Sequence, residues 1–392
     1  MGHHNFDQII SRENSSCVKY DLRELVFGND KVLPMWVADM DIATPDFILN
    51  HLADRIKHPF LGYTIRDKEF NNAIVWWNKK RHSWSVNPDH ISICAGVVSG
   101  LNHAIQAFTS PGDKIIIQTP VYHPFFSTIK NNGREIVQNP LINKDMKYYI
   151  DFDNLENVAS QGATMMVISN PHNPVGRVWH KDELLKLGEI CLKYNILVVS
   201  DEIHSDLILK PNVQVPFASL SEQFAMNSVT FASTSKTFNL AGLFTGHAII
   251  SNPELLEKYN HALEVTGAGH GHIFGFEAVK AAYTAMGEEW LEELLQYIQG
   301  NAQLVENYLK ANLPKIKLAE LQGTYLLWLD FRGFGFDDDK INNLLIHKAE
   351  VGLNKGSIFG TEGIGFQRMN IACPRSQVET ALERINKVFK GV

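Results

Sequence analysis

Short apolar runs alternate with longer amphipathic stretches through the middle of the chain. Between the runs, apolar residues recur at helical spacing, as Leu184, Leu187 and Cys191 do within residues 181–194. Short strands that alternate with helices predict an α/β fold, doubly wound around a mainly parallel central sheet. The runs expected to form its strands are residues 91–94, 114–118, 164–169, 196–200, 228–232 and 247–251.

The pattern changes towards both ends of the chain, and these changes predict the domain boundaries. Residues 46–275 contain the alternating pattern and are expected to form a large domain. Residues 276–392 combine long helical stretches, such as 290–313, with an expected strand at 324–331, which is typical of a smaller α+β domain. Residues 1–45 have little regular pattern and are expected to form an N-terminal arm that contributes to the smaller domain.

The composition is ordinary for a globular protein and excludes several classes of function. Hydrophobic residues make up 45% of the 392 residues and the net charge is −7, so the sequence has no basic footprint for a nucleic acid. No run of about 18 apolar residues is present, and we expect no membrane span. The four cysteines form no C-x-x-C pair and the N-terminus lacks the apolar core of a signal peptide, which indicates a cytoplasmic protein without structural zinc.

Polar or turn-forming residues follow five of the expected strands. In open α/β sheets, ligands bind beyond the carboxyl ends of the strands, so we expect these five segments to meet at one site. The segments are AGVV from residue 95, TPVYHPF from 119, NPHNPVG from 170, DEIH from 201 and STSK from 233.

The segment after the first run begins a helix and is suited to a phosphate group. Backbone N–H groups of Gly96, Val97 and Val98 would lie at the positive end of the helix dipole. Ser233 and Ser235 would add hydroxyl donors from another strand end.

Four further side chains at the strand ends have both an ordinary and a functional interpretation. Asp201 is either a helix cap or a partner for a protonated ring nitrogen, and Tyr122 is either a core aromatic or a stacking plate. Asn173 alone would be a turn residue, and Lys236 alone would be a solvated charge. Together, a phosphate site, a planar partner, a carboxylate and an amine describe pyridoxal 5′-phosphate (PLP).

Other ligand motifs are missing or incomplete. The sequence contains neither a phosphate-binding G-x-x-x-x-G-K-[ST] loop nor the zinc motif H-E-x-x-H. GAGHGH at 267–272 follows no expected strand, so it is a poor dinucleotide fingerprint. His270 and His272 have no evident third ligand, and we expect no metal site.

These residues resemble the fold-type I, PLP-dependent enzymes of the aminotransferase class I/II superfamily. Over nearly its whole length, the chain resembles the MalY/PatB group of cystathionine β-lyases. The resemblance implies a PLP-dependent transferase-like fold and a homodimer whose active sites are shared between subunits. It is carried by six motifs in the family's order: LPMWVADMD (33–41), FLGYT (60–64), HNPVGRVW (172–179), SDEIHSDL (200–207), STSKTFNLAGL (233–243) and FQRMNIACPRS (366–376).

The resemblance implies a role for each residue of the cofactor site. Lys236 would form a Schiff base with the cofactor, and Asp201 would pair with its pyridine nitrogen. Asn173 would hydrogen-bond the phenolic oxygen of the ring, and Tyr122 would stack on the ring. The phosphate would be held by Gly96, Val97, Val98, Ser233 and Ser235.

The resemblance also implies the residues that bind substrate. Arg368 would bind the substrate carboxylate through its planar fork, and it fits the family's Arg-x-Asn pattern better than its neighbour Arg375 does. Tyr63 would reach the phosphate or the substrate of the neighbouring subunit and act in catalysis there. Tyr122 and Ala38 are also expected to contact substrate.

Two positions depart from the pattern of many aminotransferases. Phe244 stands eight residues after Lys236, where many of them have a phosphate-binding arginine. The lyase branch tends to lack that arginine, which favours a lyase. His204 stands three residues after Asp201 in place of a tyrosine. We expect His204 at the cofactor, while its contact with the phenolic oxygen is left open.

The implied activity is PLP-dependent α,β-elimination by a carbon–sulfur β-lyase. L-Cystathionine or an L-cysteine-type substrate would yield pyruvate, ammonia and a thiol or hydrogen sulfide, with the amine of Lys236 as general base. One alternative is an aminotransferase on the same fold, which a product assay distinguishes. An alternative of another class is a regulatory protein that acts through protein contacts.

Overall fold

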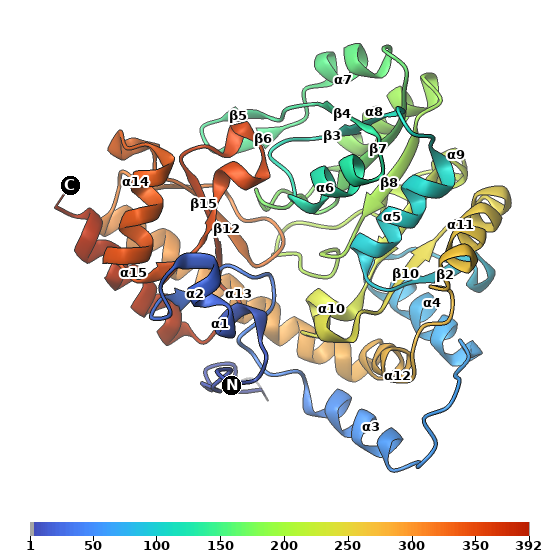
Figure 1. Cartoon of the computed structure of the whole chain (residues 1–392), viewed down its shortest axis with the longest axis horizontal. Helices are drawn as coiled ribbons and strands as arrows, with labels where there is room; N and C mark the ends of the chain where they lie inside the picture. Colours follow the sequence, from blue (N-terminus) through green and yellow to red (C-terminus); the bar gives the residue numbers. More distant parts are fainter. Residues whose placement is uncertain (1–3, 392) are drawn as a thin grey trace.

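The computed structural model describes residues 4–391 and contains a seven-stranded central sheet (Figure 1). The strand order is β2-β10-β9-β8-β7-β3-β4, and β10 runs antiparallel to both of its neighbours while the other pairs are parallel. The predicted α/β fold with a mainly parallel sheet is confirmed. The strands are β2 (Ile91–Cys94), β3 (Lys114–Ile117), β4 (Glu135–Gln138), β7 (Ala163–Ser169), β8 (Leu197–Asp201), β9 (Ser228–Ala232) and β10 (Gly246–Ile249).

Alternate residues of the central strands face opposite sides of the sheet. In β7, Met165 and Val167 belong to one buried cluster, and Met166 and Ile168 belong to the other. Helices cover both faces, so the strands read as continuous apolar runs. The first face is covered by α4 (Lys68–His82), α5 (Val97–Phe108), α6 (Pro124–Asn131), α11 (Pro253–Thr266) and α12 (Ile273–Ala282), and the second by α7 (Phe152–Ala159), α8 (Lys181–Lys193) and α9 (Glu222–Met226).

A second, antiparallel sheet lies towards the C-terminus of the chain. Its strand order is β11-β12-β15-β14. Trp328 of β12 pairs with Arg368 of β15, which fixes where that arginine lies. The elements of this region are α13 (Ala285–Asn312), β11 (Lys317–Leu318), β12 (Leu326–Asp330), α14 (Asp338–Asn343), a π-helical turn (Leu344–Lys348), β14 (Asn354–Lys355), β15 (Phe366–Asn370) and α15 (Arg375–Phe389).

The N-terminal segment lies against this C-terminal region (Figure 1). Its strand β1 (Leu33–Pro34) pairs in parallel with β13 (Val351–Gly352), more than 300 residues further along the chain. This pairing is consistent with the predicted arm, and the domain boundaries themselves stay a prediction. The other helices of this part are α1 (Val18–Asp21), α2 (Arg23–Phe27) and α3 (Asp46–Ile56).

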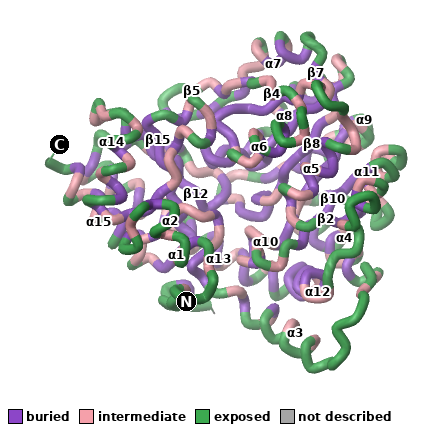
Figure 2. The backbone as a smooth tube through the Cα atoms, in the orientation of Figure 1, coloured by how far each residue is buried: buried purple, intermediate pink, exposed green. Residues whose placement is uncertain are grey.

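Burial is uneven over the molecule. Figure 2 shows buried strands at the centre and an exposed stretch that connects α3 to α4. Residues 57–67 of this stretch form no helix or strand and are mostly exposed. Along residues 4–391, no helix is both long enough and apolar enough to span a lipid bilayer.

Two strand pairings in the structure are not predicted by the sequence analysis. β4 lies at the edge of the central sheet, and its ends Glu135 and Gln138 are exposed, so its apolar pattern is short. The hairpin of β5 (Ile142–Lys144) and β6 (Lys147–Tyr149) is largely polar. Hydrophobic patterning detects half-exposed or edge strands poorly, because few of their side chains are buried.

Candidate active site

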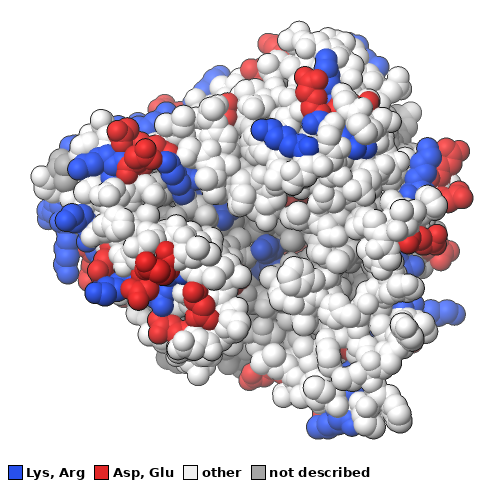
Figure 3. Space-filling model, in the orientation of Figure 1, with Lys and Arg blue, Asp and Glu red and all other residues white. Residues whose placement is uncertain are grey.

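A cavity of about 200 Å³ lies at the carboxyl ends of the central strands. All five polar segments that follow the expected strands contribute to its wall. The face shown in Figure 3 is hollowed near its centre, where a basic group is visible. The predicted site residues that line the cavity are Ala38, Gly96, Val97, Val98, Tyr122, Asn173, Asp201, His204, Ser233, Ser235 and Lys236, together with Phe244.

Lys236 extends into this cavity from the four-residue helix α10 (Thr234–Thr237), directly after β9. Its Nζ donates a hydrogen bond of 2.6 Å to the carbonyl of Ala38. Desolvation lowers the pKa of Lys236 to about 8, and the positive charge of Arg368 adds to this effect, whereas Asp39 and Asp201 oppose it. Near neutral pH, a larger share of Lys236 is therefore unprotonated and able to accept a proton than of a free lysine with a pKa of about 10.4.

Asp201 ends strand β8 and is buried. Its Oδ1 accepts a hydrogen bond of 3.1 Å from the backbone N–H of Ile203. Burial raises the pKa of Asp201 to about 7, although that hydrogen bond and the charge of Lys236 lower it. A cationic N–H group in the cavity would stabilise the charged carboxylate, so this residue suits a protonated ring nitrogen.

The N-terminus of α5 opens onto the same cavity. Gly96 precedes the helix with a φ of 83°, a conformation that favours glycine, and it lines the cavity together with Val97 and Val98, the first residues of the helix. The hydroxyl of Ser233 donates to the carbonyl of Thr245 (2.6 Å) and accepts from the N–H of Ser235 (3.0 Å). Ser233 therefore also caps α10, and its predicted phosphate contact stays a prediction.

Arg368 lies on β15 beside the cavity wall and is buried. Its guanidinium donates to the side-chain oxygens of Asn173 (3.0 Å) and Asn354 (2.6 Å) and to the carbonyl of Trp36 (3.0 Å). It also lies 4.8 Å from the ring centre of Phe359. Burial lowers the pKa of Arg368 to about 10, a value at which it still carries its charge near neutral pH.

The rival Arg375 lies elsewhere, at the start of α15. Its Nε donates to Asn301 (3.2 Å), and its guanidinium stacks 5.0 Å from the ring centre of Tyr297. Because Arg368 contacts Asn173 of the cavity wall, its placement favours Arg368 as the carboxylate-binding residue. That role stays a prediction.

Tyr63 and His204 occupy contrasting positions. Tyr63 is fully exposed on the segment 57–67 and does not line the cavity of its own chain. His204 is buried in the cavity wall, its ring lies edge-on to Tyr325 at 5.9 Å, and its Nδ1 has no hydrogen-bond partner among residues 4–391. Burial lowers the pKa of His204, so the ring is neutral and available for one further hydrogen bond.

The structure adds residues that the sequence analysis does not identify. The hydroxyl of Tyr325 donates to the carbonyl of Ala38 at 2.9 Å, the same oxygen that accepts from Lys236. Ser169 and Thr245 also line the cavity. The only sequence signal for Ser169 is its place at the end of an expected strand, and Tyr325 has none because it lies in a run that reads as core.

Of the two histidines in GAGHGH, His272 has a structural role. Its Nδ1 accepts a hydrogen bond from the N–H of Gly275 and so caps α12. Within residues 4–391, no group of three or more His, Cys, Asp or Glu side chains is arranged to hold a metal ion.

The family model for aminotransferase class I and II matches residues 32–385. The chain belongs to this family. The resemblance stated from the sequence motifs is therefore confirmed.

Relatives in this family match the chain from end to end. Cystathionine beta-lyase PatB of Bacillus subtilis is 43% identical over 97% of this chain and 98% of its own. The structure of cystalysin from Treponema denticola, which contains pyridoxal 5′-phosphate, has a TM-score of 0.96 and 39% identity, and the match covers 99% of each chain. The PLP-bound C-S lyase from Staphylococcus hominis has a TM-score of 0.92 and 32% identity over 98% of each chain.

The cavity fits the cofactor of this family on its own chemistry. The N-terminus of α5 matches a phosphate, the buried Asp201 matches a cationic ring nitrogen, and the amine of Lys236 matches an aldehyde. All three groups line one small cavity. The residues present therefore match the phosphate, the ring nitrogen and the aldehyde of PLP.

Proposed function

We propose that the protein is a PLP-dependent carbon–sulfur β-lyase. The observation that carries the proposal is the 43% identity to a cystathionine β-lyase over 97% of the chain. The cavity supports it, because Lys236, Asp201 and the N-terminus of α5 suit the aldehyde, ring nitrogen and phosphate of PLP. Phe244 lines this cavity, eight residues after Lys236, where many aminotransferases have a phosphate-binding arginine.

Each cavity residue has a role in this proposal. Lys236 holds the cofactor covalently at rest, and Asp201 keeps the ring nitrogen protonated. Asn173 hydrogen-bonds the phenolic oxygen, and Tyr122 stacks on the ring. Arg368 binds the substrate carboxylate, and its contact with Asn173 at 3.0 Å connects the substrate and cofactor ends of the site.

The proton transfers fall to this chain's own groups. Bound PLP supplies an electron sink that stabilises the negative charge at Cα after proton loss. The substrate's α-amine would displace the amine of Lys236 from its bond to the cofactor, and the freed amine, in its unprotonated form, would remove the α-proton. With a pKa of about 8, about a tenth of the free amine is unprotonated at pH 7, far more than for an ordinary lysine. The bond from Cβ to sulfur would then break with its electron pair on sulfur, and the sulfur would take up the proton held by Lys236 and leave as a thiol. Water then converts the remaining aminoacrylate to pyruvate and ammonia.

The substrates are L-cystathionine or an L-cysteine-type amino acid. Arg368 provides a buried cation for the α-carboxylate, and the α-amine must approach Lys236. Cystathionine would release homocysteine, and cysteine would release hydrogen sulfide.

A product assay tests the proposed activity. Purified protein supplied with PLP should make pyruvate, ammonia and thiol in equal amounts from L-cystathionine or L-cysteine, without a keto acid. Turnover that requires a keto-acid acceptor would instead indicate an aminotransferase. The Lys236→Ala variant is the control, and it should make no pyruvate.

We also infer a cytoplasmic homodimer in which Tyr63 serves the partner's active site. Segment 57–67 exposes Phe60, Leu61, Tyr63 and Ile65 by 57% to 109%, although apolar side chains on a monomer surface are usually scattered singly. Burial of this segment against a second copy would remove it from water. The four cysteines are all free, which suits a reducing compartment.

A further inference from the structure

Residues 36–42 form a strap that passes the Lys236 side of the cavity. The carbonyl of Ala38, in the middle of this strap, accepts hydrogen bonds from the Nζ of Lys236 (2.6 Å) and the hydroxyl of Tyr325 (2.9 Å). The carbonyl of Trp36, at its start, accepts one from Arg368 (3.0 Å). The strap therefore contacts both the candidate catalytic amine and the candidate substrate-binding arginine.

Two asparagines hold the rest of the strap's backbone. The Nδ2 of Asn370 donates to the carbonyls of Val37 (2.7 Å) and Asp39 (2.6 Å). Asn239, three residues after Lys236, accepts from the N–H of Met40 (3.0 Å) and donates to the Met40 carbonyl (3.0 Å). The position of the strap is thus coupled to the segment that contains Lys236.

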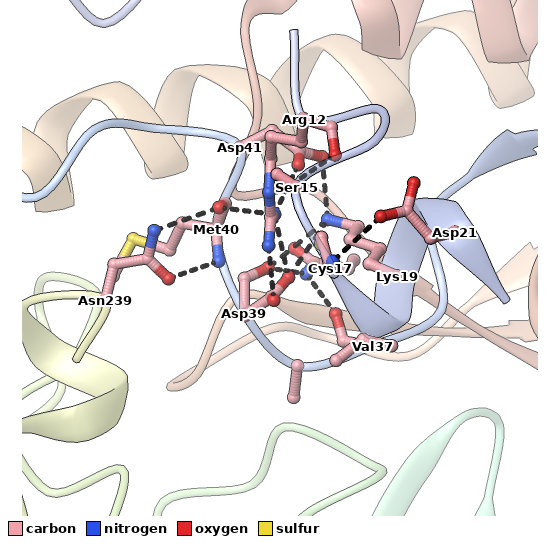
Figure 4. A network of polar contacts seen from close by, with 12 residues as sticks. Arg12, Ser15, Cys17, Lys19, Asp21, Val37, Asp39, Met40, Asp41 and Asn239 are labelled. Carbon is pink, nitrogen blue, oxygen red and sulfur yellow. Dashed lines mark hydrogen bonds and ion pairs between the residues drawn. The ribbon is translucent and has the colours of Figure 1, made fainter. Parts of the chain in front are cut away.

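The N-terminal segment adds a cluster of opposite charges on the strap (Figure 4). Arg12 forms a two-pronged ion pair with Asp39, at 3.1 and 2.7 Å, and reaches Asp41 at 2.7 Å. Lys19 lies 2.7 Å from Asp41 and 3.6 Å from Asp39. Lys19 and Asp41 are 1% and 4% exposed, so this pairing is largely shielded from solvent.

Asp39 follows the residue whose carbonyl holds the amine of Lys236. Its negative charge favours the protonated amine, as does that of Asp201, whereas Arg368 favours the neutral amine. Without a neighbouring positive charge, the carboxylate of Asp39 would therefore reduce the share of the Lys236 amine that is unprotonated and able to accept a proton. In the structure, Arg12 and Lys19 offset that charge.

We propose that Arg12 and Lys19 are positioning residues that balance the charge of Asp39, hold the strap in place and thereby favour the unprotonated form of the Lys236 nitrogen. This inference rests on the proposed function, because it assumes that Lys236 binds PLP. Two arginines, Arg12 and Arg23, lie over the Tyr20 ring and provide the test variant and its matched control. Arg12 lies 5.6 Å and Arg23 lies 5.5 Å from the ring centre, yet Arg23 forms its ion pair with Glu13 and not with the strap.

The experiment is a pH titration of the visible absorbance of PLP-loaded protein, which follows protonation of the Lys236 nitrogen while it is bound to the cofactor. We expect Arg12→Gln to raise the titration midpoint and Asp39→Asn to lower it, each by about half a unit to one unit. Arg12→Lys, which keeps the charge, should retain most of the wild-type midpoint. Arg23→Gln should match the wild type.

Opposite shifts distinguish charge balance from loss of structure. A strap that merely loosened would change KM or the melting temperature in both variants without moving the midpoints in opposite directions. Midpoints that stay unchanged, or that move the same way in Arg12→Gln and Asp39→Asn, overturn the inference. Absence of the PLP band from the wild-type protein would instead refute the proposed function on which the inference rests.

Discussion

At the scale of single residues, Lys236 combines two features: it lies on the short helix α10, and its pKa is lowered. A lysine attacks an aldehyde only in its unprotonated form, whose share falls about tenfold for each pH unit below the pKa. With a pKa of about 8, we expect cofactor-free protein to regain lysine-bound PLP about tenfold faster at pH 7 than at pH 6, with a plateau above about pH 9. The recovery of visible absorbance after PLP addition measures this rate.

Two comparisons make that measurement specific. Lys236→Ala should show no recovery of the band at any pH. A free lysine model compound, with a pKa of about 10.4, should still react faster with each step above pH 9. If the protein follows the model compound, the amine of Lys236 is not desolvated in the way that the cavity indicates.

The strand-end rule predicts part of the site and misses the rest for a physical reason. Tyr122, Asn173, Asp201 and Lys236 meet because parallel strands bring their carboxyl ends to one edge. Hydrogen bonds across distant segments leave no such pattern. Asn239, for example, bonds Met40 across 199 residues, and nothing in the local sequence indicates that pairing.

The N-terminus of α5 is the element that most directly tests phosphate binding. Gly96 has a φ of 83°, and a Cβ there would meet no atom within 4 Å, so a substitution adds backbone strain without a clash. We expect Gly96→Ala to cost about 1–3 kcal/mol of stability and to raise the Kd for PLP, because the helix N–H groups would turn away from the phosphate. Thermal melting and a PLP titration measure the two effects.

Gly162 provides the matched control for this substitution. It also has a φ of 83° and open space at its Cβ, but it lies in the turn before β7 and does not line the cavity. Gly162→Ala should lower the melting temperature by a similar amount and leave PLP affinity unchanged. Equal losses of PLP affinity in both variants would show that strain alone, and not phosphate binding at α5, explains the result.

Strands can be predicted from the sequence where both of their faces are buried, because such burial produces a continuous apolar run. β7, with five consecutive buried residues from Met165 to Ser169, is such a case. β1 escapes detection because it has two residues and owes its existence to pairing with β13. The segment Leu344–Lys348 continues α14 as a π-helical turn, which hydrophobic periodicity does not distinguish from α-helix.

At the scale of the whole molecule, the proposed dimer predicts complementation between two inactive variants. Lys236→Ala and Tyr63→Ala homodimers should each have little activity. In a mixed dimer, one site has Lys236 together with the partner's intact Tyr63, so about a quarter of wild-type activity should return when the chains reassort at random. Pyruvate formation after mild unfolding and joint refolding measures this.

The controls separate a shared site from general effects of refolding. Tyr149→Ala changes another exposed tyrosine, 39% exposed on β6, and should remain active as a homodimer. Light scattering should give twice the chain mass of 44.2 kDa. A mixture of Lys236→Ala and Tyr63→Ala that stays inactive, or a monomeric mass, would contradict the shared-site dimer.

The strap also determines when during synthesis the protein can become active. Arg368 and Asn370 bond its carbonyls across 332 and 333 residues, so the strap leaves the ribosome long before its partners exist. Lys236 emerges in the interval, while the Ala38 carbonyl still lacks this support. Such long-range contacts form late in folding. A nascent chain therefore has Lys236, the lysine proposed to bind the cofactor, before it has the surroundings that tune that lysine, and lyase activity is expected only once the whole polypeptide is complete.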